Sequence, residues 1–300
     1  MDVLKVTPRG YCYGVVDALV LAKRAAKDPS LPRPIVVLGQ IVHNRHAVDE
    51  LATYGIQTLD TTPGSARLDL LDQVPPGATV IFTAHGVSPA VRAEAARRGF
   101  HILDATCPDV TKTHRLIQDR TRNGYFILYI GTPGHPEPEG AMGEAVPGRA
   151  TLVATVAEAE SVEIPPGPVA IMTQTTLSQW DTATIIAALL KRRPDAEVHN
   201  EICLATQLRQ EAVVKSAADV DLVVVVGDAR SNNSNRLVEV SQQVGGTRSV
   251  RVDTVLDLRP EWLDGVSRVA VTAGSSTPSP ITRAVIQQLE AWGVEAQHGR

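Results

Sequence analysis

The sequence predicts an α/β fold built from three related modules, each with a small parallel sheet. Two observations support this prediction. First, six short apolar runs alternate with helical patterns, which is typical of buried parallel strands joined through helices. Second, three single cysteines recur at a nearly constant interval, since Cys12 and Cys107 are 95 positions apart and Cys107 and Cys203 are 96 apart. A repeated interval of this kind indicates repeated structural units.

The apolar runs and helical patterns place the expected elements in order along the chain. Strands are expected at 34–39, 79–84, 125–130, 169–172, 222–226 and 269–271. Five of these runs lead into helical patterns at 47–51, 89–98, 179–191, 236–244 and 280–292. The cysteine interval divides this series into expected modules of residues 14–105, 106–200, and 201–300 together with 1–13.

Composition excludes several classes of function. The chain has 300 residues, a formal net charge of −4 and only 4% aromatic residues, and its basic residues are scattered. A nucleic-acid partner is therefore not expected. No apolar run approaches the roughly 20 residues that span a bilayer, so no membrane partner is expected either. Three distant cysteines without an export signal predict free thiols in a reducing cytoplasm.

Polar side chains follow every predicted strand. In parallel sheets, ligands bind beyond the carboxyl ends of the strands. The loops there are expected to form a ring of hydrogen-bond donors that suits a phosphate or diphosphate. The ring comprises His43, His85, His135, Thr175, Ser231, Asn233 and Ser276. Helix capping is the ordinary alternative for any single Ser, Thr or Asn. Neither a P-loop nor a dinucleotide-binding glycine motif occurs, so a nucleotide site is not supported.

The cysteines suit a metal centre. Cys12 and Cys107 lie at predicted loop-to-helix junctions, where a helix N-terminus favours the thiolate. No C-x-x-C pair occurs, which disfavours a zinc ribbon or a redox dithiol. Three converging thiolates would fit a 4Fe–4S cluster with one open iron that lacks a cysteine ligand. A zinc site with three Cys and one His is the competing interpretation, and buried packing is the alternative for each thiol alone.

Only one of the six loops has a carboxylate close to the polar residue that follows the strand. It runs His135-Pro136-Glu137-Pro138-Glu139. The two prolines predict a stiff extended segment that holds Glu137 in place. A carboxylate enclosed in a site can have a raised pKa and act as a general acid.

Nine motifs in order carry a resemblance to a known family. They occupy residues 8–15, 41–44, 83–88, 104–108, 134–137, 173–178, 201–206, 234–237 and 272–274. With these motifs, the whole chain resembles the 4-hydroxy-3-methylbut-2-enyl diphosphate reductase (LytB) family. The resemblance implies a trefoil of three α/β modules around a central 4Fe–4S cluster.

The resemblance also implies roles for individual residues. Cys12, Cys107 and Cys203 match the cluster ligands. The matches to the residues that hold the diphosphate are His43, His85, Ser231, Asn233 and Ser276. His135 and Gln174 match residues that line the pocket, while Glu137 and Thr175 match the pair that delivers a proton. Asn232 stands where some relatives have Ser, and its amide can still donate to a phosphate oxygen.

The implied activity is reductive dehydroxylation of 4-hydroxy-3-methylbut-2-enyl diphosphate to isopentenyl diphosphate and dimethylallyl diphosphate. This reaction is the last step of the non-mevalonate isoprenoid pathway. Reduced ferredoxin or flavodoxin would supply the electrons. Two alternatives stay open at this point: an iron–sulfur dehydratase without net electron transfer, and a redox sensor that binds a phosphorylated metabolite.

Overall fold

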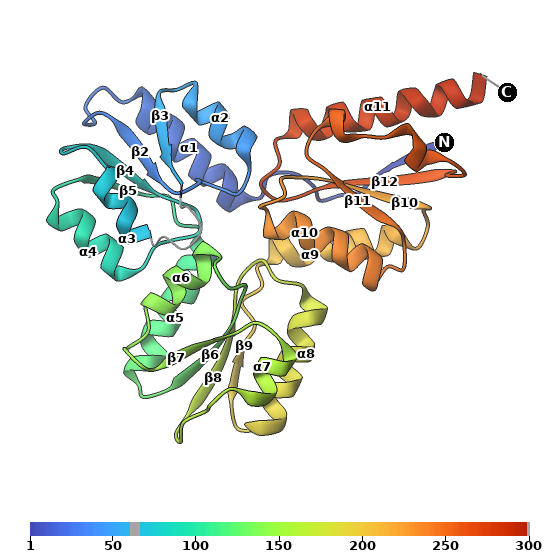
Figure 1. The fold of residues 1–300 in the computed structure, drawn as a ribbon. Helices are drawn as coiled ribbons and strands as arrows, with labels where there is room; N and C mark the ends of the chain where they lie inside the picture. Colours follow the sequence, from blue (N-terminus) through green and yellow to red (C-terminus); the bar gives the residue numbers. More distant parts are fainter. Residues whose placement is uncertain (61–66, 299–300) are drawn as a thin grey trace. The chain divides into compact units, whose positions relative to one another are not determined.

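A computed structural model describes residues 1–60 and 67–298, with the backbone alone for 295–298. Within these residues the chain forms three sheets of four strands each, and every strand pair is parallel (Figure 1). The predicted α/β class with three small parallel sheets is therefore confirmed.

Sheet I has the strand order β3-β2-β4-β5. Its strands are β2 (Ile35–Leu38), β3 (Ile56–Leu59), β4 (Thr79–Phe82) and β5 (His101–Asp104). Its helices are α1 (Tyr13–Lys27), α2 (Arg45–Ala52), α3 (Arg67–Leu70), the 3-10 helix η1 (Leu71–Gln73) and α4 (Pro89–Arg97). The central strands β2 and β4 are buried along their whole length, because helices cover both faces of the sheet.

Sheet II has the order β7-β6-β8-β9. Its strands are β6 (Phe126–Ile130), β7 (Ala150–Val153), β8 (Val169–Thr173) and β9 (Glu197–His199). Its helices are α5 (Pro108–Arg122), α6 (Pro136–Gly143), α7 (Val156–Ser161) and α8 (Gln179–Arg192). Helices α5 and α6 pack together on one face, and α7 and α8 pack together on the other (Figure 1).

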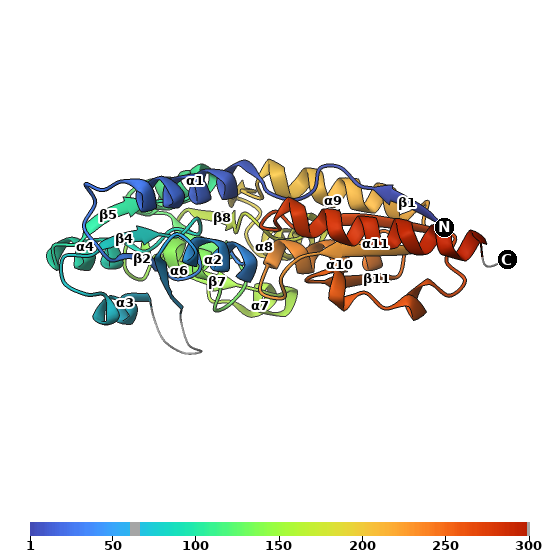
Figure 2. The same ribbon diagram turned by 90° about the horizontal axis from the view of Figure 1, so that it is seen from above.

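Sheet III has the order β1-β12-β10-β11 and joins the two ends of the chain. Its strands are β1 (Asp2–Lys5), β10 (Leu222–Val226), β11 (Ser249–Val252) and β12 (Arg268–Ala273). Its helices are α9 (Leu204–Ala217), α10 (Asn232–Gln243), α11 (Ser279–His298), η2 (Val255–Asp257) and η3 (Pro260–Leu263). Helix α11 runs beside β1, so both termini belong to this part of the chain (Figure 2).

The three sheets share one topology. In each sheet an edge strand (β5, β9 or β1) pairs with a central strand (β4, β8 or β12), and the edge strand leads through a cysteine into a helix. The cysteine interval therefore follows the topological repeat. The sequence predicted a loop-to-helix junction for two of the cysteines, and the structure has one at all three.

Each predicted apolar run forms a strand, but the other six strands found among the described residues were not predicted. The physical reason is their exposure. Edge strands β1 and β5 have an intermediate or exposed side chain at every position, so they contain no continuous apolar run. Strand β9 is similar.

The described residues divide into two compact units. The terminal unit contains Met1–Tyr13, His43–Ala47 and the chain from Leu204 onward. The central unit contains Gly14–Val42 and Val48–Cys203. The three module boundaries stay a prediction. No helix in the described part of the chain combines the length and apolarity needed to cross a bilayer.

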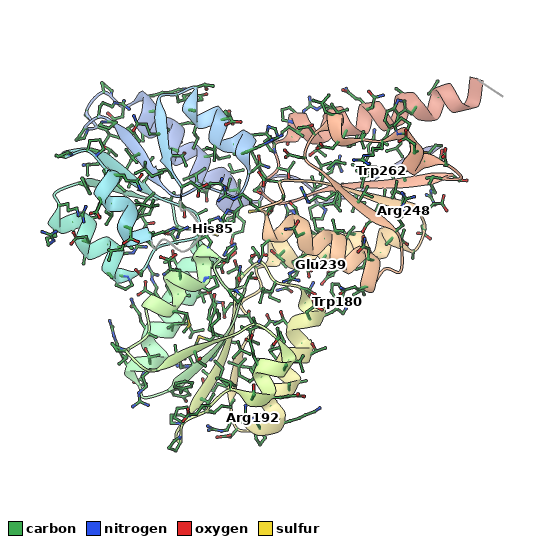
Figure 3. All side chains as sticks on the ribbon, viewed as in Figure 1. His85, Trp180, Arg192, Glu239, Arg248 and Trp262 are labelled. Atoms are coloured by element: carbon green, nitrogen blue, oxygen red, sulfur yellow. The ribbon has the colours of Figure 1, made fainter. Side chains whose placement is uncertain are left out.

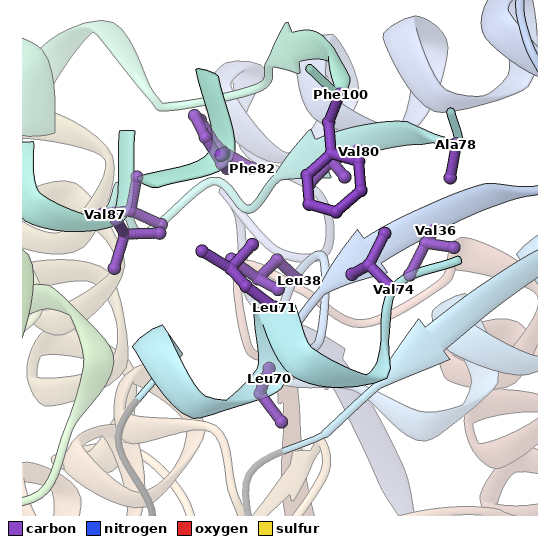
Figure 4. Packing of buried hydrophobic residues seen from close by; sticks show 12 residues of the cluster. Val36, Leu38, Leu70, Leu71, Val74, Ala78, Val80, Phe82, Val87 and Phe100 are labelled. Carbon is purple, nitrogen blue, oxygen red and sulfur yellow. The ribbon is translucent and has the colours of Figure 1, made fainter. Parts of the chain in front are cut away.

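A dense apolar cluster supports one face of sheet I. Val36 and Leu38 from β2 and Val80 and Phe82 from β4 lie against η1 and the segments around it (Figure 4). Phe82 is fully buried at the end of β4, directly before the loop that carries His85. Its ring therefore supports both the sheet and the start of a candidate site loop.

Replacing Phe82 with Ala should lower the free energy of unfolding by about 3–5 kcal/mol, because it leaves a cavity in a closed core. Leu256 is 90% exposed on η2, so Leu256→Ala should change the free energy by about 0.5 kcal/mol or less. Denaturant unfolding of the two variants measures both values. Equal effects would show that Phe82 does not support the core as described.

Candidate active site

The three cysteines are held by the same backbone hydrogen bond in all three sheets. The amide of Cys107 donates to the carbonyl of Ala84 at 3.0 Å, two residues after β4 ends. Cys203 donates to Thr175 at 3.0 Å, two residues after β8, and Cys12 donates to Ser275 at 3.1 Å, two residues after β12. Each thiol is thereby placed at the carboxyl edge of its own sheet, where a helix begins.

The thiol of Cys107 is packed against a glycine. A Cβ atom built on Gly14 would lie 2.5 Å from Sγ of Cys107, which is closer than real atoms approach. Gly14 is the second residue of α1 and follows Cys12 by two positions in the chain. A side chain at position 14 would therefore displace the Cys107 sulfur.

The donor set fits a thiolate-bound cluster. All three cysteines are only partly buried, and no disulfide joins them. Cys107 is the N-cap of α5, and Cys12 and Cys203 directly precede α1 and α9. The partial positive charge of a helix N-terminus stabilises a thiolate, which is the form that binds iron.

His85 and His135 lie together in the central unit. His85 is in the loop after β4 (Figure 3), and its ring meets that of His135 edge-on with centroids 5.2 Å apart. His135 is the N-cap of α6, and its Nδ1 accepts the amide hydrogen of Glu137 at 3.1 Å. Since Nδ1 accepts, a neutral His135 carries its proton on Nε2.

Two residues that sequence reasoning missed support this pair of loops. The ring of His114, on α5, fills the space between Gly86 and Gly140, where added Cβ atoms would lie 2.9 and 3.2 Å from its Cε1. Its Nδ1 is 3.0 Å from Oε1 of Glu144. The buried guanidinium of Arg67 donates to the carbonyl of Gly86 at 2.9 Å. No local sequence pattern marks either residue, since their partners are distant in the chain.

Glu137 and Thr175 form a closed pair. The amide of Thr175 donates to Oε1 of Glu137 at 2.7 Å, and the Thr175 hydroxyl donates to Oε2 at 3.0 Å. Glu137 is 2% exposed and Thr175 is 4% exposed. The carboxyl group of Glu137 is thus shielded from solvent, and both of its oxygens accept hydrogen bonds from Thr175.

Burial raises the pKa of Glu137 to about 7. The two hydrogen bonds from Thr175 act in the opposite direction, and the charge of Asp109 adds to the rise. Loss of hydration outweighs the hydrogen bonds because a buried carboxylate forfeits most of its solvation. A carboxyl group with this pKa is about half protonated near pH 7 and can donate its proton.

The prediction that prolines hold Glu137 on an extended segment is wrong. Pro136 begins helix α6, and Glu137 and Pro138 lie in its first turn. Proline is well tolerated there because the first amide groups of a helix have no partner within it. The helix turns Glu137 inward, whereas Glu139 is exposed.

Gln174 holds the loop after β6. Its side-chain oxygen accepts the Thr132 amide hydrogen at 2.9 Å, and its Nε2 donates to the Thr176 hydroxyl at 3.2 Å. Gln174 is fully buried. Both ends of its amide have protein partners, so the observed contacts support the loop; its predicted contact with a substrate stays a prediction.

The terminal unit gathers the remaining predicted polar residues at the ends of β10 and β12. Ser231 caps α10, and its hydroxyl lies 3.4 Å from that of Ser276, which also donates to the carbonyl of His43 at 3.0 Å. Oδ1 of Asn233 accepts the Ser275 amide hydrogen at 2.9 Å. Asn232 is the first residue of α10 and is half-buried.

The segment that carries His43 is anchored in the terminal unit by Asp228, which sequence reasoning also missed. One oxygen of the buried Asp228 carboxylate accepts the Arg45 amide hydrogen at 2.8 Å, at the start of α2. The other accepts the Arg230 amide hydrogen at 2.8 Å. The side chain of Asp253 pairs with Arg45 at 2.7 Å. These acids hold the backbone and side chain of Arg45, two residues after His43, without a recognisable motif.

Comparison with known proteins gives consistent results. The family model described as LytB protein matches residues 3–290. The 4-hydroxy-3-methylbut-2-enyl diphosphate reductase of Symbiobacterium thermophilum is 55% identical over 99% of both chains. The Brevibacillus brevis protein of the same name is 56% identical, over 97% of this chain and 92% of that protein.

Two solved structures share the fold. The E-1-hydroxy-2-methyl-but-2-enyl-4-diphosphate reductase from Plasmodium falciparum has a TM-score of 0.89 and 33% identity, covering 96% of this chain and 87% of that one. A structure of (E)-4-hydroxy-3-methyl-but-2-enyl diphosphate reductase, described as the terminal enzyme of the non-mevalonate pathway, has a TM-score of 0.67 and 30% identity, covering 97% and 100%. From the topology, the site geometry and these matches, the chain belongs to the LytB protein family.

Proposed function

We propose that this chain reductively removes the hydroxyl group of 4-hydroxy-3-methylbut-2-enyl diphosphate, yielding isopentenyl diphosphate and dimethylallyl diphosphate. Two electrons and two protons enter, the allylic C–O bond breaks, one C–H bond forms, and the oxygen leaves as water. The single observation that carries this proposal is the buried Glu137–Thr175 pair, with a Glu137 pKa of about 7. The reductases of this name among the relatives support it.

Cys12, Cys107 and Cys203 would hold the cofactor, a 4Fe–4S cluster, through their thiolates. Such a cluster would supply single electrons and, since the three cysteines leave one iron without a thiolate, a Lewis-acidic site. A reduced ferredoxin or flavodoxin delivers these electrons to the enzyme. The cysteines must stay reduced for this purpose, and we therefore propose a cytoplasmic location.

The remaining side chains hold the substrate and move protons. The diphosphate oxygens accept hydrogen bonds from His43, His85, Ser231, Asn232, Asn233 and Ser276. Glu137 donates the proton that converts the leaving hydroxyl group to water, and the Thr175 hydroxyl orients its carboxyl group. His135 keeps Glu137 in place through the hydrogen bond at its Nδ1 and lines the pocket together with Gln174. Burial of Glu137 keeps bulk water away from this proton.

Anaerobic reconstitution should load roughly four iron and four sulfide ions per chain and give a brown protein. Replacing Cys107 with Ser should lower the bound iron, because one thiolate ligand is lost. Metal and sulfide analysis with the visible spectrum measures both. A colourless protein that binds one zinc ion would refute the cluster and favour the zinc alternative.

Replacing Glu137 with Gln should reduce turnover about 10²–10⁴-fold, the usual contribution of a general acid, while the cluster spectrum is unchanged. In the parent enzyme, turnover should fall as pH rises through about 7, because the acid form of Glu137 is lost there. Glu160→Gln, at an exposed position on α7, is the matched control. Dye-coupled assays measure turnover; full activity of the Glu137 variant would remove it from the mechanism.

Replacing Thr175 with Val removes the hydroxyl that donates to Glu137 and leaves the amide donor in place. Since that hydroxyl lowers the pKa of Glu137, its loss should raise the pKa further and move the falling limb of the pH–rate profile to higher pH. Thr175→Ser should restore the parent profile. A limb that stays in place or moves to lower pH contradicts the assigned hydrogen bond.

A further inference from the structure

The terminal unit contains a cleft of about 600 Å³ that the proposed chemistry does not use. It lies between the segment that follows β1 and helices α9 and α11. Four basic residues and one acidic residue line it, a formal charge of +3 in a chain whose net charge is −4. These residues are Lys5, Arg9, Arg209, Arg283 and Glu290. Its charge is thus opposite in sign to that of the whole protein.

The basic residues of the cleft divide into structural and available ones. Arg209 is 4% exposed and donates to the carbonyls of Gly10 and Ala205, both at 2.7 Å. It therefore has a structural role, because it ties the segment after β1 to helix α9. Lys5 pairs with Glu290 at 2.7 Å. Arg9 donates to the carbonyl of Val6 and the hydroxyl of Thr7, both uncharged groups, and Arg283 is exposed on α11. The positive charge that remains available comes from Arg9 and Arg283.

The cleft adjoins a proposed cluster ligand. Gly10 and Tyr11 line it, and Cys12 is the next residue in the chain. The Arg209 guanidinium fixes the Gly10 carbonyl, and the Cys12 amide is bonded to Ser275. A partner bound in the cleft would therefore touch the backbone that leads directly into a cysteine ligand, a short route for an electron.

We propose that this cleft is the docking surface for an acidic one-electron carrier protein; the inference rests on the proposed reductase function. The basic lining attracts a negatively charged partner and raises its rate of association. Electron-transfer encounters use small interfaces that release quickly, which suits a shallow charged cleft.

A second basic pocket provides an internal comparison. It has a volume of about 390 Å³, lies in the central unit at the start of α5, and is lined by Thr106, Pro108, Thr111, Lys112 and Arg115. It also adjoins a cysteine, Cys107. However, Lys112 is paired with Glu201 at 2.8 Å, which leaves Arg115 as the uncompensated charge of its lining. It is therefore the weaker attractor for an acidic partner.

The test reverses one charge in each pocket of the reconstituted holoenzyme. Arg283→Glu alters the cleft from an exposed position on α11, and Gln287→Glu adds a negative charge at a second exposed position on the same helix. Arg115→Glu is the matched control. Turnover is measured with reduced flavodoxin at several salt concentrations, and separately with a small reduced dye that needs no docking site.

Arg283→Glu and Gln287→Glu should each raise the KM for flavodoxin about tenfold at low salt and flatten its salt dependence. Dye-driven turnover should stay within about twofold of the parent, as expected for surface changes outside the site. Arg283→Lys should restore the parent KM. An unchanged KM, an equal loss with the dye, or a larger effect from Arg115→Glu overturns the docking surface. Loss of dye-driven turnover in the parent itself would instead overturn the proposed function.

Discussion

A hydrogen bond from each cysteine amide to a carbonyl two residues past the neighbouring strand recurs in all three sheets, and the candidate site depends on it. The bond places Cys12, Cys107 and Cys203 at the carboxyl edges of their sheets. In a parallel sheet this edge is where the loops and helix N-termini gather. The same constraint that places a thiolate therefore also brings polar loop residues and positive helix ends to its side.

The central unit adds an acid to this framework through burial. Parallel strands β6 and β8 bring α6 and the loop after β8 together, so that Glu137 meets Thr175. The glycines at 86 and 140 leave room for the His114 ring between these loops, while Arg67 ties down the Gly86 carbonyl. The pKa of Glu137 is a consequence of this packing, since a solvated carboxylate at the same helix end would stay ionised.

The two proposals assign two kinds of anion recognition to the terminal unit. At the ends of β10 and β12, the proposed diphosphate site consists of neutral hydroxyl and amide groups from Ser231, Asn233 and Ser276, which would make directed hydrogen bonds. Beside β1 and α11, the cleft with Arg9 and Arg283 provides long-range charge with little geometric restriction. Charge of this second kind suits a partner that must arrive and leave quickly.

The sequence by itself determined the six strands with continuous apolar runs, the three cysteines and the family motifs, because burial on both faces and the chemistry of the site impose local patterns. The half-exposed strands β1, β5 and β9 carry no such pattern, and their positions depend on pairing with central strands. Tertiary structure alone decided that Pro136 begins a helix and that Asp228, His114 and Arg67 support the site. Their partners lie far along the chain, and the pKa of Glu137 depends on how those distant atoms exclude water.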